Sequence, residues 1–161
     1  MEQSELTVRM AQAQDVPRIL ELLVQVNNLH HDLRPDLFVE GRTKYEADAL
    51  HTMLGKPDAP ILVAVDENGL VRGYLFGVVR AWSGPNLTGS KSFYIDDLCV
   101  DAACRGTGVG SLLLARAKIC AIDLGCRDMT LNVWEGNDSA QRFYRGSGFT
   151  TRSCLMERKL R

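Results

Sequence analysis

The chain has 161 residues, the usual size of one domain, and we treat residues 1–161 as a single domain. Its net charge of −1, from 19 basic and 20 acidic residues, excludes the strongly basic surface of a nucleic-acid-binding protein. No run reaches the ~18 apolar residues of a membrane span, so we expect neither nucleic acid nor a membrane as a partner.

The cysteines and the N-terminus indicate the compartment. The five cysteines are odd in number and form no Cys-x-x-Cys motif, which is typical of reduced thiols in a cytoplasmic protein. Residues 1–5 are acidic and lack the apolar segment of a signal peptide. The pair His30-His31 is the one candidate for a metal site. Adjacent residues do not share a helix face and no other ligand cluster accompanies them, so we predict solvated or lid histidines and no metal.

The first half of the chain alternates between strand and helix patterns. Asp15 before Pro17 predicts a helix start, with the carboxylate as cap and proline in the first turn. A turn at 66–69 between two apolar runs predicts a β-hairpin. The expected elements are a strand over 6–10, a helix from Asp15 to about Asn28, a loop over 29–36, a helix over 43–54, and strands over 60–65 and 71–82.

The second half continues with a strand, a glycine loop and a helix. That helix is apolar nearly all round, so we predict that it is largely buried. A strand reached through a helical crossover is expected to pair in parallel with the strand before it. The expected elements are strands over 93–100 and 129–134, helices over 108–124 and from 137 or 138 to 146, and one or two closing strands over 149–160. The fold class is therefore α+β, with mixed α/β layers.

The glycine loop, residues 104–111, has the local geometry of an anion site. Glycine permits positive φ, and the first amides of the following helix lack intrahelical partners. These features favour phosphate or pyrophosphate. The loop lacks the lysine of a P-loop, and Ser111 stands where a dinucleotide fingerprint has its third glycine. The pattern that fits is Arg-x-x-Gly-x-Gly, formed by Arg105, Gly108 and Gly110.

A second motif follows about 30 residues downstream. It reads Asn-x-x-Ala-x-x-Phe-Tyr from Asn137 to Tyr144 and ends in Gly148-Phe149. Together the two motifs resemble the GNAT superfamily of N-acetyltransferases, and the resemblance covers residues 60–160. It implies a twisted mixed sheet that splays between the strands at 93–100 and 128–134. Acetyl-CoA is then expected to lie in the splay.

The resemblance also implies a set of cofactor contacts. Backbone amides of the glycine loop would cradle the pyrophosphate, and Arg105 would add a charge at its rim. The backbone groups of Leu98 and Val100 would pair with the pantetheine arm, and the amide at 98 would donate to the thioester oxygen. The expected cofactor-binding residues are Leu98, Cys99, Val100, Arg105, Gly106, Thr107, Gly108, Val109, Gly110, Ser111, Asn137, Ala140 and Tyr144.

Two side chains are the expected catalytic groups. Tyr144 shares one helix face with Asn137, and a phenol, with its pKa of ~10, can protonate a departing thiolate. Asp96 lies in a strand that resembles the Tyr-Leu-Glu-Asp-Leu-Tyr-Val strand of diamine and ribosomal-protein acetyltransferases. There the matching acid binds the amine or relays its proton; Asp96 is shorter, which favours a water relay. Asp97 is predicted to point to the opposite face.

We therefore predict an acetyl-CoA-dependent N-acetyltransferase that transfers acetyl directly to a primary amine. The acceptor stays open among a polyamine or other small amine, an aminoglycoside-like compound, and a protein N-terminus or lysine. The alternative from another class is a non-catalytic acyl-CoA-binding sensor domain. The oligomeric state is also left open, with a homodimer as one option.

Overall fold

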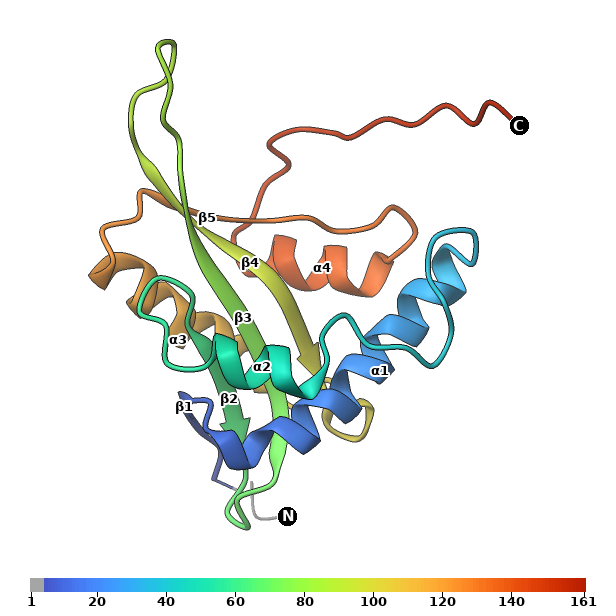
Figure 1. The fold of residues 1–161 in the computed structure, drawn as a ribbon, viewed down its shortest axis with the longest axis vertical. Helices are drawn as coiled ribbons and strands as arrows, with labels where there is room; N and C mark the ends of the chain where they lie inside the picture. The colour runs from blue at the N-terminus through green and yellow to red at the C-terminus, as the bar shows by residue number, and fades with distance from the viewer. Residues whose placement is uncertain (1–4) are drawn as a thin grey trace.

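The computed structural model describes residues 5–161, in which one twisted five-stranded sheet carries helices on both faces (Figure 1). This arrangement confirms the predicted mixed α+β class. The elements are β1 (Thr7–Met10), η1 (Ala13–Asp15), α1 (Val16–Leu33), α2 (Ala47–Met53), β2 (Ile61–Val65), β3 (Val71–Ala81), β4 (Lys91–Val100), η2 (Ala102–Cys104), α3 (Val109–Asp123), β5 (Asp128–Leu131) and α4 (Asp138–Gly146).

The sheet is mixed. Its order is β1-β2-β3-β4-β5, so each strand lies beside its neighbours in sequence. The pairs from β1 to β4 are antiparallel, and β5, which returns after α3, pairs in parallel with β4. The predicted hairpin and the parallel crossover are therefore both confirmed.

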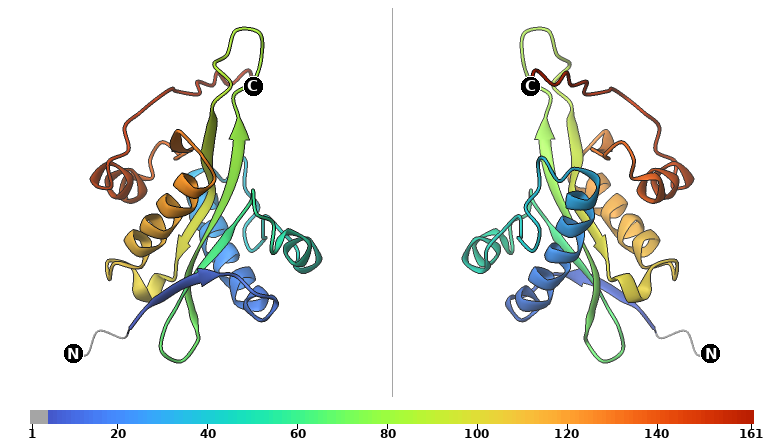
Figure 2. Two further views of the ribbon diagram at one scale, coloured as in Figure 1. Left: turned by 90° about the vertical axis from the view of Figure 1, so that its left-hand side faces the viewer. Right: turned by 90° about the vertical axis from the view of Figure 1, so that its right-hand side faces the viewer.

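Each face of the sheet has its own core. Figure 2 shows α1 and α2 on one face and α3 and α4 on the other. On the first face, Ile19 and Leu23 pack on Tyr74 and Phe76. On the second face, residues of α3 pack on Leu75 and Phe93, and α4 covers the edge of this cluster. We call these the α1 face and the α3 face.

Helix α1 is longer than its sequence pattern predicted. It continues through His30 and His31, for which the sequence pattern predicts a loop, and it ends at Leu33, because Pro35 disfavours further helix. His30 packs on Phe38 with ring centroids 5.1 Å apart, and the His31 ring bonds the carbonyl of Phe38 at 2.7 Å. Both histidines thus hold the segment after α1 against the helix.

Asp15 does not cap α1 as predicted. It stands at the N-cap position, but its carboxylate accepts hydrogen bonds from Arg9 at 2.7 and 3.0 Å and from the amide of Gln12 at 2.8 Å. The carboxylate therefore caps η1 and links it to β1 through the ion pair with Arg9. The guanidinium of Arg9 offsets the cost of burial and lowers the pKa of Asp15.

Helix α3 is buried on one side only, so the prediction of a largely buried helix was wrong. Leu113 and Ala117 are inaccessible, whereas Leu112, Ile119 and Ile122 are 43%, 49% and 64% exposed. The physical reason is the layer structure: one face of the helix meets the sheet, and no further element of the described residues covers the other face.

The closing strands predicted over 149–160 are absent. No strand follows α4 in the described chain, and residues 150–161 run away from the sheet as an extended segment. We call this segment the C-terminal arm. The predicted second helix was also too long, because α2 begins at Ala47 and residues 34–46 form a loop over the sheet.

Candidate active site

The splay predicted between the two central strands is present. β5 pairs only with Ser92–Ile95, so Asp96–Val100 of β4 have no neighbouring strand on that side in the part of the chain that the structure describes. The amide of Asp101 donates to the carbonyl of Arg72, the second residue of β3, at 2.8 Å. Alternation along an antiparallel ladder then turns the amides and carbonyls of Leu98 and Val100 away from β3, into the splay. A free strand edge therefore faces the opening.

The glycine loop follows the free part of β4, after the short helix η2, and leads into α3. Gly106 and Gly108 have φ of 75° and 93°, and a Cβ built on either would meet nothing within 4 Å. None of the amides of 105–111 donates to an acceptor within residues 5–161; the first amide that does is that of Leu112, to Gly108 at 3.1 Å. A cluster of free amides at a helix N-terminus, with space in front of it, fits a pyrophosphate.

Gly110 has a different reason to be glycine. Its φ is not positive, and a Cβ there would lie 2.9 Å from Cζ of Phe143 in α4. The missing side chain lets α4 approach α3 closely. The second glycine of the loop motif and the phenylalanine of the downstream motif therefore form one contact, which spacing alone did not indicate.

A β-bulge brings the two carboxylates of β4 to one face. Phe76 of β3 pairs with Asp97, but the next residue, Gly77, pairs with Ile95, so Asp96 is an extra residue on β4. Because of this extra residue, the side chains of Asp96 and Asp97 do not point to opposite faces, as successive side chains of a regular strand do. Asp96 accepts from Tyr45 and Asp97 accepts from Tyr74, both on the α1 face. The prediction that Asp97 points to the opposite face was wrong.

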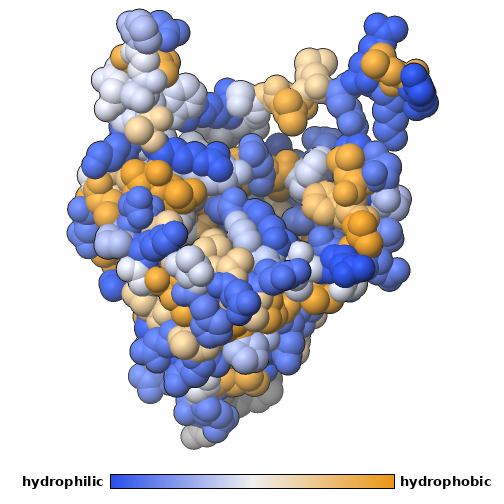
Figure 3. Space-filling view, viewed as in Figure 1, coloured by the Kyte–Doolittle hydropathy of each residue, from blue (hydrophilic) through white to orange (hydrophobic). Residues whose placement is uncertain are grey.

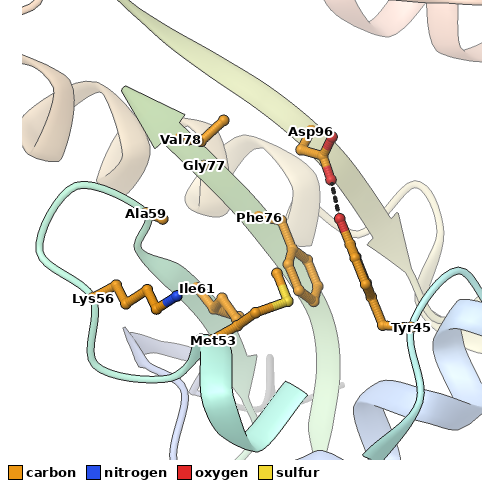
Figure 4. A pocket seen from close by; sticks show the side chains of 9 residues that line it. All are labelled: Tyr45, Met53, Lys56, Ala59, Ile61, Phe76, Gly77, Val78 and Asp96. Carbon is orange, nitrogen blue, oxygen red and sulfur yellow. Dashed lines mark hydrogen bonds between the residues drawn. The ribbon is translucent and has the colours of Figure 1, made fainter. Parts of the chain in front are cut away.

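Asp96 carries a full set of partners. Lys44 Nζ and the Tyr45 hydroxyl both lie 2.7 Å from its Oδ2 (the Tyr45 bond is drawn in Figure 4). Burial alone would favour the neutral acid, but these two hydrogen bonds outweigh it and lower the pKa of Asp96. The carboxylate is therefore charged and already holds one ammonium group, that of Lys44.

The pKa of Asp97 is shifted in the opposite direction. Within residues 5–161, its one side-chain partner is the Tyr74 hydroxyl at 3.2 Å. Burial removes water from the carboxylate and raises the pKa of Asp97 to about 6, against the attraction of Lys44 and with the help of the negative charge on Asp96. Two adjacent carboxylates with pKa values pushed apart are typical of acid–base sites.

Tyr144 lies on the α3 face, between two other aromatic rings. Its ring centroid is 5.2 Å from that of Phe143 and 5.6 Å from that of Phe149. Its hydroxyl makes no hydrogen bond with residues 5–161, so the donor is available to a ligand. Burial raises the pKa of Tyr144, and the charge of Asp97 raises it further. The phenol therefore stays protonated across the physiological pH range.

Some side chains that were predicted to contact the cofactor already make hydrogen bonds within the fold. Asn137 caps α4, because its side-chain oxygen accepts from the amide of Ala140 at 3.2 Å. Cys99 is buried on the α1 face, where its thiol donates to Leu22 and burial raises its pKa to about 12. The side chain of Cys99 is therefore part of the core.

A cavity of about 240 Å³ lies on the α1 face beside Asp96 (Figure 4). Tyr45 and Phe76, whose rings stack 5.7 Å apart, form one wall, and the loop after α2 forms another. Sequence reasoning missed Lys44, Tyr45 and this cavity, because nothing in the local pattern of residues 43–46 shows that they reach β4. The residues that line the cavity are Tyr45, Met53, Lys56, Ala59, Ile61, Phe76, Gly77, Val78 and Asp96.

Within residues 5–161, no group of three or more His, Cys, Asp or Glu side chains is placed to hold a metal ion. No helix in this part of the chain is long and apolar enough to cross a membrane.

Comparison with known proteins identifies the class. The profile of the Acetyltransferase (GNAT) family matches residues 9–149. Because the match covers most of the chain, the protein belongs to the GNAT acetyltransferase family, whose acetyl donor is acetyl-CoA.

The relatives and solved structures agree with this family. A thialysine N-ε-acetyltransferase of Bos taurus is 30% identical over 77% of this chain and 66% of its own length. The peptidyl-lysine N-acetyltransferase YjaB of Escherichia coli (strain K12) is 29% identical over 89% of this chain and 82% of its own. A match to YwnH of Bacillus subtilis (strain 168) covers 53% of that protein. The chain therefore spans between about half and two thirds of the length of YwnH and of the bovine relative.

Among solved structures, a tetramutant of the BH1408 protein from Bacillus halodurans superposes with a TM-score of 0.90. It is 27% identical, and the superposition covers 96% of this chain and 99% of that one. The likeness therefore extends over nearly the whole fold.

Proposed function

We propose that this chain is an N-acetyltransferase that moves the acetyl group of acetyl-CoA directly to a primary amine. The observation that carries the proposal is the convergence of three features at one opening in the sheet. These are the free amides of 105–111, the unpaired edge of Leu98 and Val100, and the carboxylate pair on β4.

The donor side of the opening is formed by the chain's backbone. The amides from Gly106 to Ser111 would bind the pyrophosphate, and Arg105, which donates to Val100 at 3.4 Å, stands at the rim. The edge at Leu98 and Val100 would bind the pantetheine arm. Acetyl-CoA, when bound, supplies the thioester carbonyl that accepts the amine. The Leu98 amide would donate to the carbonyl oxygen, where negative charge develops.

Lys44 suggests how the acceptor binds. Its ammonium lies 2.7 Å from Asp96, which lines the cavity, and the Lys44 side chain is 47% exposed. A charged carboxylate that already holds a lysine-type ammonium suits the ammonium of a substrate. We assign Asp96 this binding role, with the incoming amine replacing Lys44. The bovine and E. coli relatives act, by their names, on lysine-type amines, which supports an acceptor of this class.

Protons must move at two atoms during transfer. The amine nitrogen must lose a proton before it attacks, and Asp97, with its pKa raised to about 6, is the group best poised to accept it near neutral pH. The coenzyme sulfur must gain a proton as its bond to the acetyl carbon breaks. The Tyr144 hydroxyl is free and protonated, and we assign it this donation.

A turnover screen tests the proposal. The purified chain and acetyl-CoA are incubated with polyamines, lysine and its analogues, aminoglycosides and N-terminal peptides, and products are identified by a mass increase of one acetyl group. Reading the mass avoids interference from the five thiols of the protein. Acetyl-CoA binding, measured by calorimetry, with no acetylated amine in any class would favour the sensor domain instead.

A further inference from the structure

The cavity beside Asp96 has room for more than one ammonium group, and its walls are mostly apolar. Its volume is about 240 Å³, whereas a water molecule takes up roughly 30 Å³ of liquid. Met53, Ile61 and Phe76 are among the side chains that line it. Figure 3 shows this face of the molecule, with a central hollow in which hydrophobic atoms are surrounded by hydrophilic ones. An acceptor that fills the cavity therefore carries an apolar segment next to its amine.

The charged side chains of the cavity wall are of opposite sign. Of the nine residues that line the cavity, Asp96 and Lys56 are the charged ones. Asp96 belongs to β4, and Lys56 belongs to the loop after α2. Figure 4 shows the Lys56 side chain extending along the cavity, with its nitrogen near Ile61 and across the cavity from the Asp96 carboxylate. The cavity thus has a negative end, an apolar middle and a positive end.

Lys56 differs from Lys44 in having no counter-ion. Lys44 pairs with Asp96, whereas the Lys56 ammonium pairs with no carboxylate of residues 5–161. The loop is closed by its backbone, because the carbonyl of Lys56 accepts from the amide of Ala59 at 3.2 Å. The charge of Lys56 therefore has no partner in the fold and is available to an anionic group of a ligand.

We propose that the cavity selects a small aliphatic amino acid as the acceptor, with the reacting amine on Asp96 and the carboxylate on Lys56. The inference rests on the transferase function proposed above and names the acceptor class that was left open there. The chain between the two ends lies along Ile61 and Phe76. The reaction is unchanged: the amine nitrogen loses a proton and bonds the acetyl carbon, the bond from that carbon to sulfur breaks, and the coenzyme sulfur gains a proton.

The other acceptor classes fit this cavity less well. A polyamine brings a second ammonium towards Lys56, and two like charges repel each other. An aminoglycoside brings hydroxylated rings against apolar walls, where its polar groups have no partners. A lysine inside a protein has amide groups at the position where the cavity offers a cation. The charge of Lys56 therefore separates a free amino acid from all three.

The first test uses acceptors that differ only at the end that does not react. δ-Aminovalerate, cadaverine and pentylamine share one carbon chain and end in a carboxylate, an ammonium and a methyl group. We expect kcat/KM for δ-aminovalerate to exceed that for cadaverine at least about tenfold, because attraction to Lys56 is replaced by repulsion. Nα-acetyl-lysine should exceed its methylamide by up to about fivefold, the usual limit for an exposed ion pair.

The second test changes Lys56 itself. Lys56→Gln should remove the preference for δ-aminovalerate, and Lys56→Glu should reverse it in favour of cadaverine. Each value is divided by that for pentylamine in the same variant, which removes any general effect on catalysis. Arg116→Glu is the matched control, since it makes the same change of charge at an exposed position of α3 on the other face, and it should keep the wild-type preference. Circular dichroism and thermal unfolding verify that each variant is folded.

Calorimetric titration of the same acceptors, with coenzyme A present, separates this inference from the proposed function. Tighter binding of δ-aminovalerate that depends on Lys56, without turnover of any amine, would refute the transferase and support the selectivity. Turnover or binding of cadaverine at least as good as that of δ-aminovalerate would overturn the selectivity and leave the transferase standing. A preference that Lys56→Glu leaves unchanged would overturn it as well.

Discussion

Replacing Asp97 by Asn tests the proton acceptor, because the raised pKa of this residue predicts both a pH profile and a cost in stability. With a pKa of about 6, Asp97 is about 90% ionised at pH 7 and about 10% ionised at pH 5. If the carboxylate accepts the amine proton, kcat/KM of the wild type should fall about tenfold between these pH values, beyond the change due to ionisation of the amine itself.

The Asp97→Asn variant should lose activity by about 10²- to 10⁴-fold at pH 7, the usual contribution of a general base. The part of the profile that titrates near pH 6 should disappear with it. Asp96→Asn is the comparison within the pair. It removes the charge that holds the ammonium, so KM for the amine should rise while the titration near pH 6 remains.

The Asp97→Asn substitution should also stabilise the fold at neutral pH. The folded-state pKa of Asp97 is above its ordinary 3.8, so ionisation costs the folded state increasingly as pH rises through this range to about 6. Asn never ionises. Its advantage should be absent below pH ~4 and reach up to about 3 kcal/mol above pH ~7, measured by denaturant unfolding. Asp97→Asn with wild-type kcat/KM and an unchanged pH profile would refute the assignment.

Three further substitutions test the other parts of the site. Tyr144→Phe should keep acetyl-CoA affinity and thermal stability but lower kcat about 10²-fold; wild-type kcat would show that the ring is only a wall of the site. Gly108→Val should weaken acetyl-CoA binding at least about tenfold by calorimetry, whereas Gly55→Val, with a similar φ of 74° and equally open surroundings, should not. Gly110→Ala should cost about 1–3 kcal/mol of stability through overpacking against Phe143, and Phe143→Leu should recover part of it; no loss in thermal unfolding would contradict the close contact.

The features that the sequence predicted correctly are those set by local chemistry. Glycines at 106 and 108 permit the positive φ of a loop, and the apolar spacing after them forms a helix whatever lies nearby. The strand patterns placed β2, β3 and β4 within two residues of their observed bounds. The parallel crossover followed from chain length and connectivity, since a helix between two strands returns the chain in the same direction.

Errors arose where a residue's neighbours are distant in sequence. The facing of Asp97 depends on the bulge opposite Phe76 and Gly77, which a strand read by itself does not show. The state of Asp96 depends on Lys44, 52 positions away.

The arm differs from a strand for the same reason. Side-chain alternation can specify which residues favour a strand, but a strand forms only where another backbone supplies its hydrogen bonds. Residues 150–161 have no such partner among residues 5–161. The sequence by itself thus determined the local elements and the two motifs. Tertiary packing decided the ionisation of the carboxylates and which edges of the sheet remain free, because both depend on charges and hydrogen-bond partners brought together only by folding.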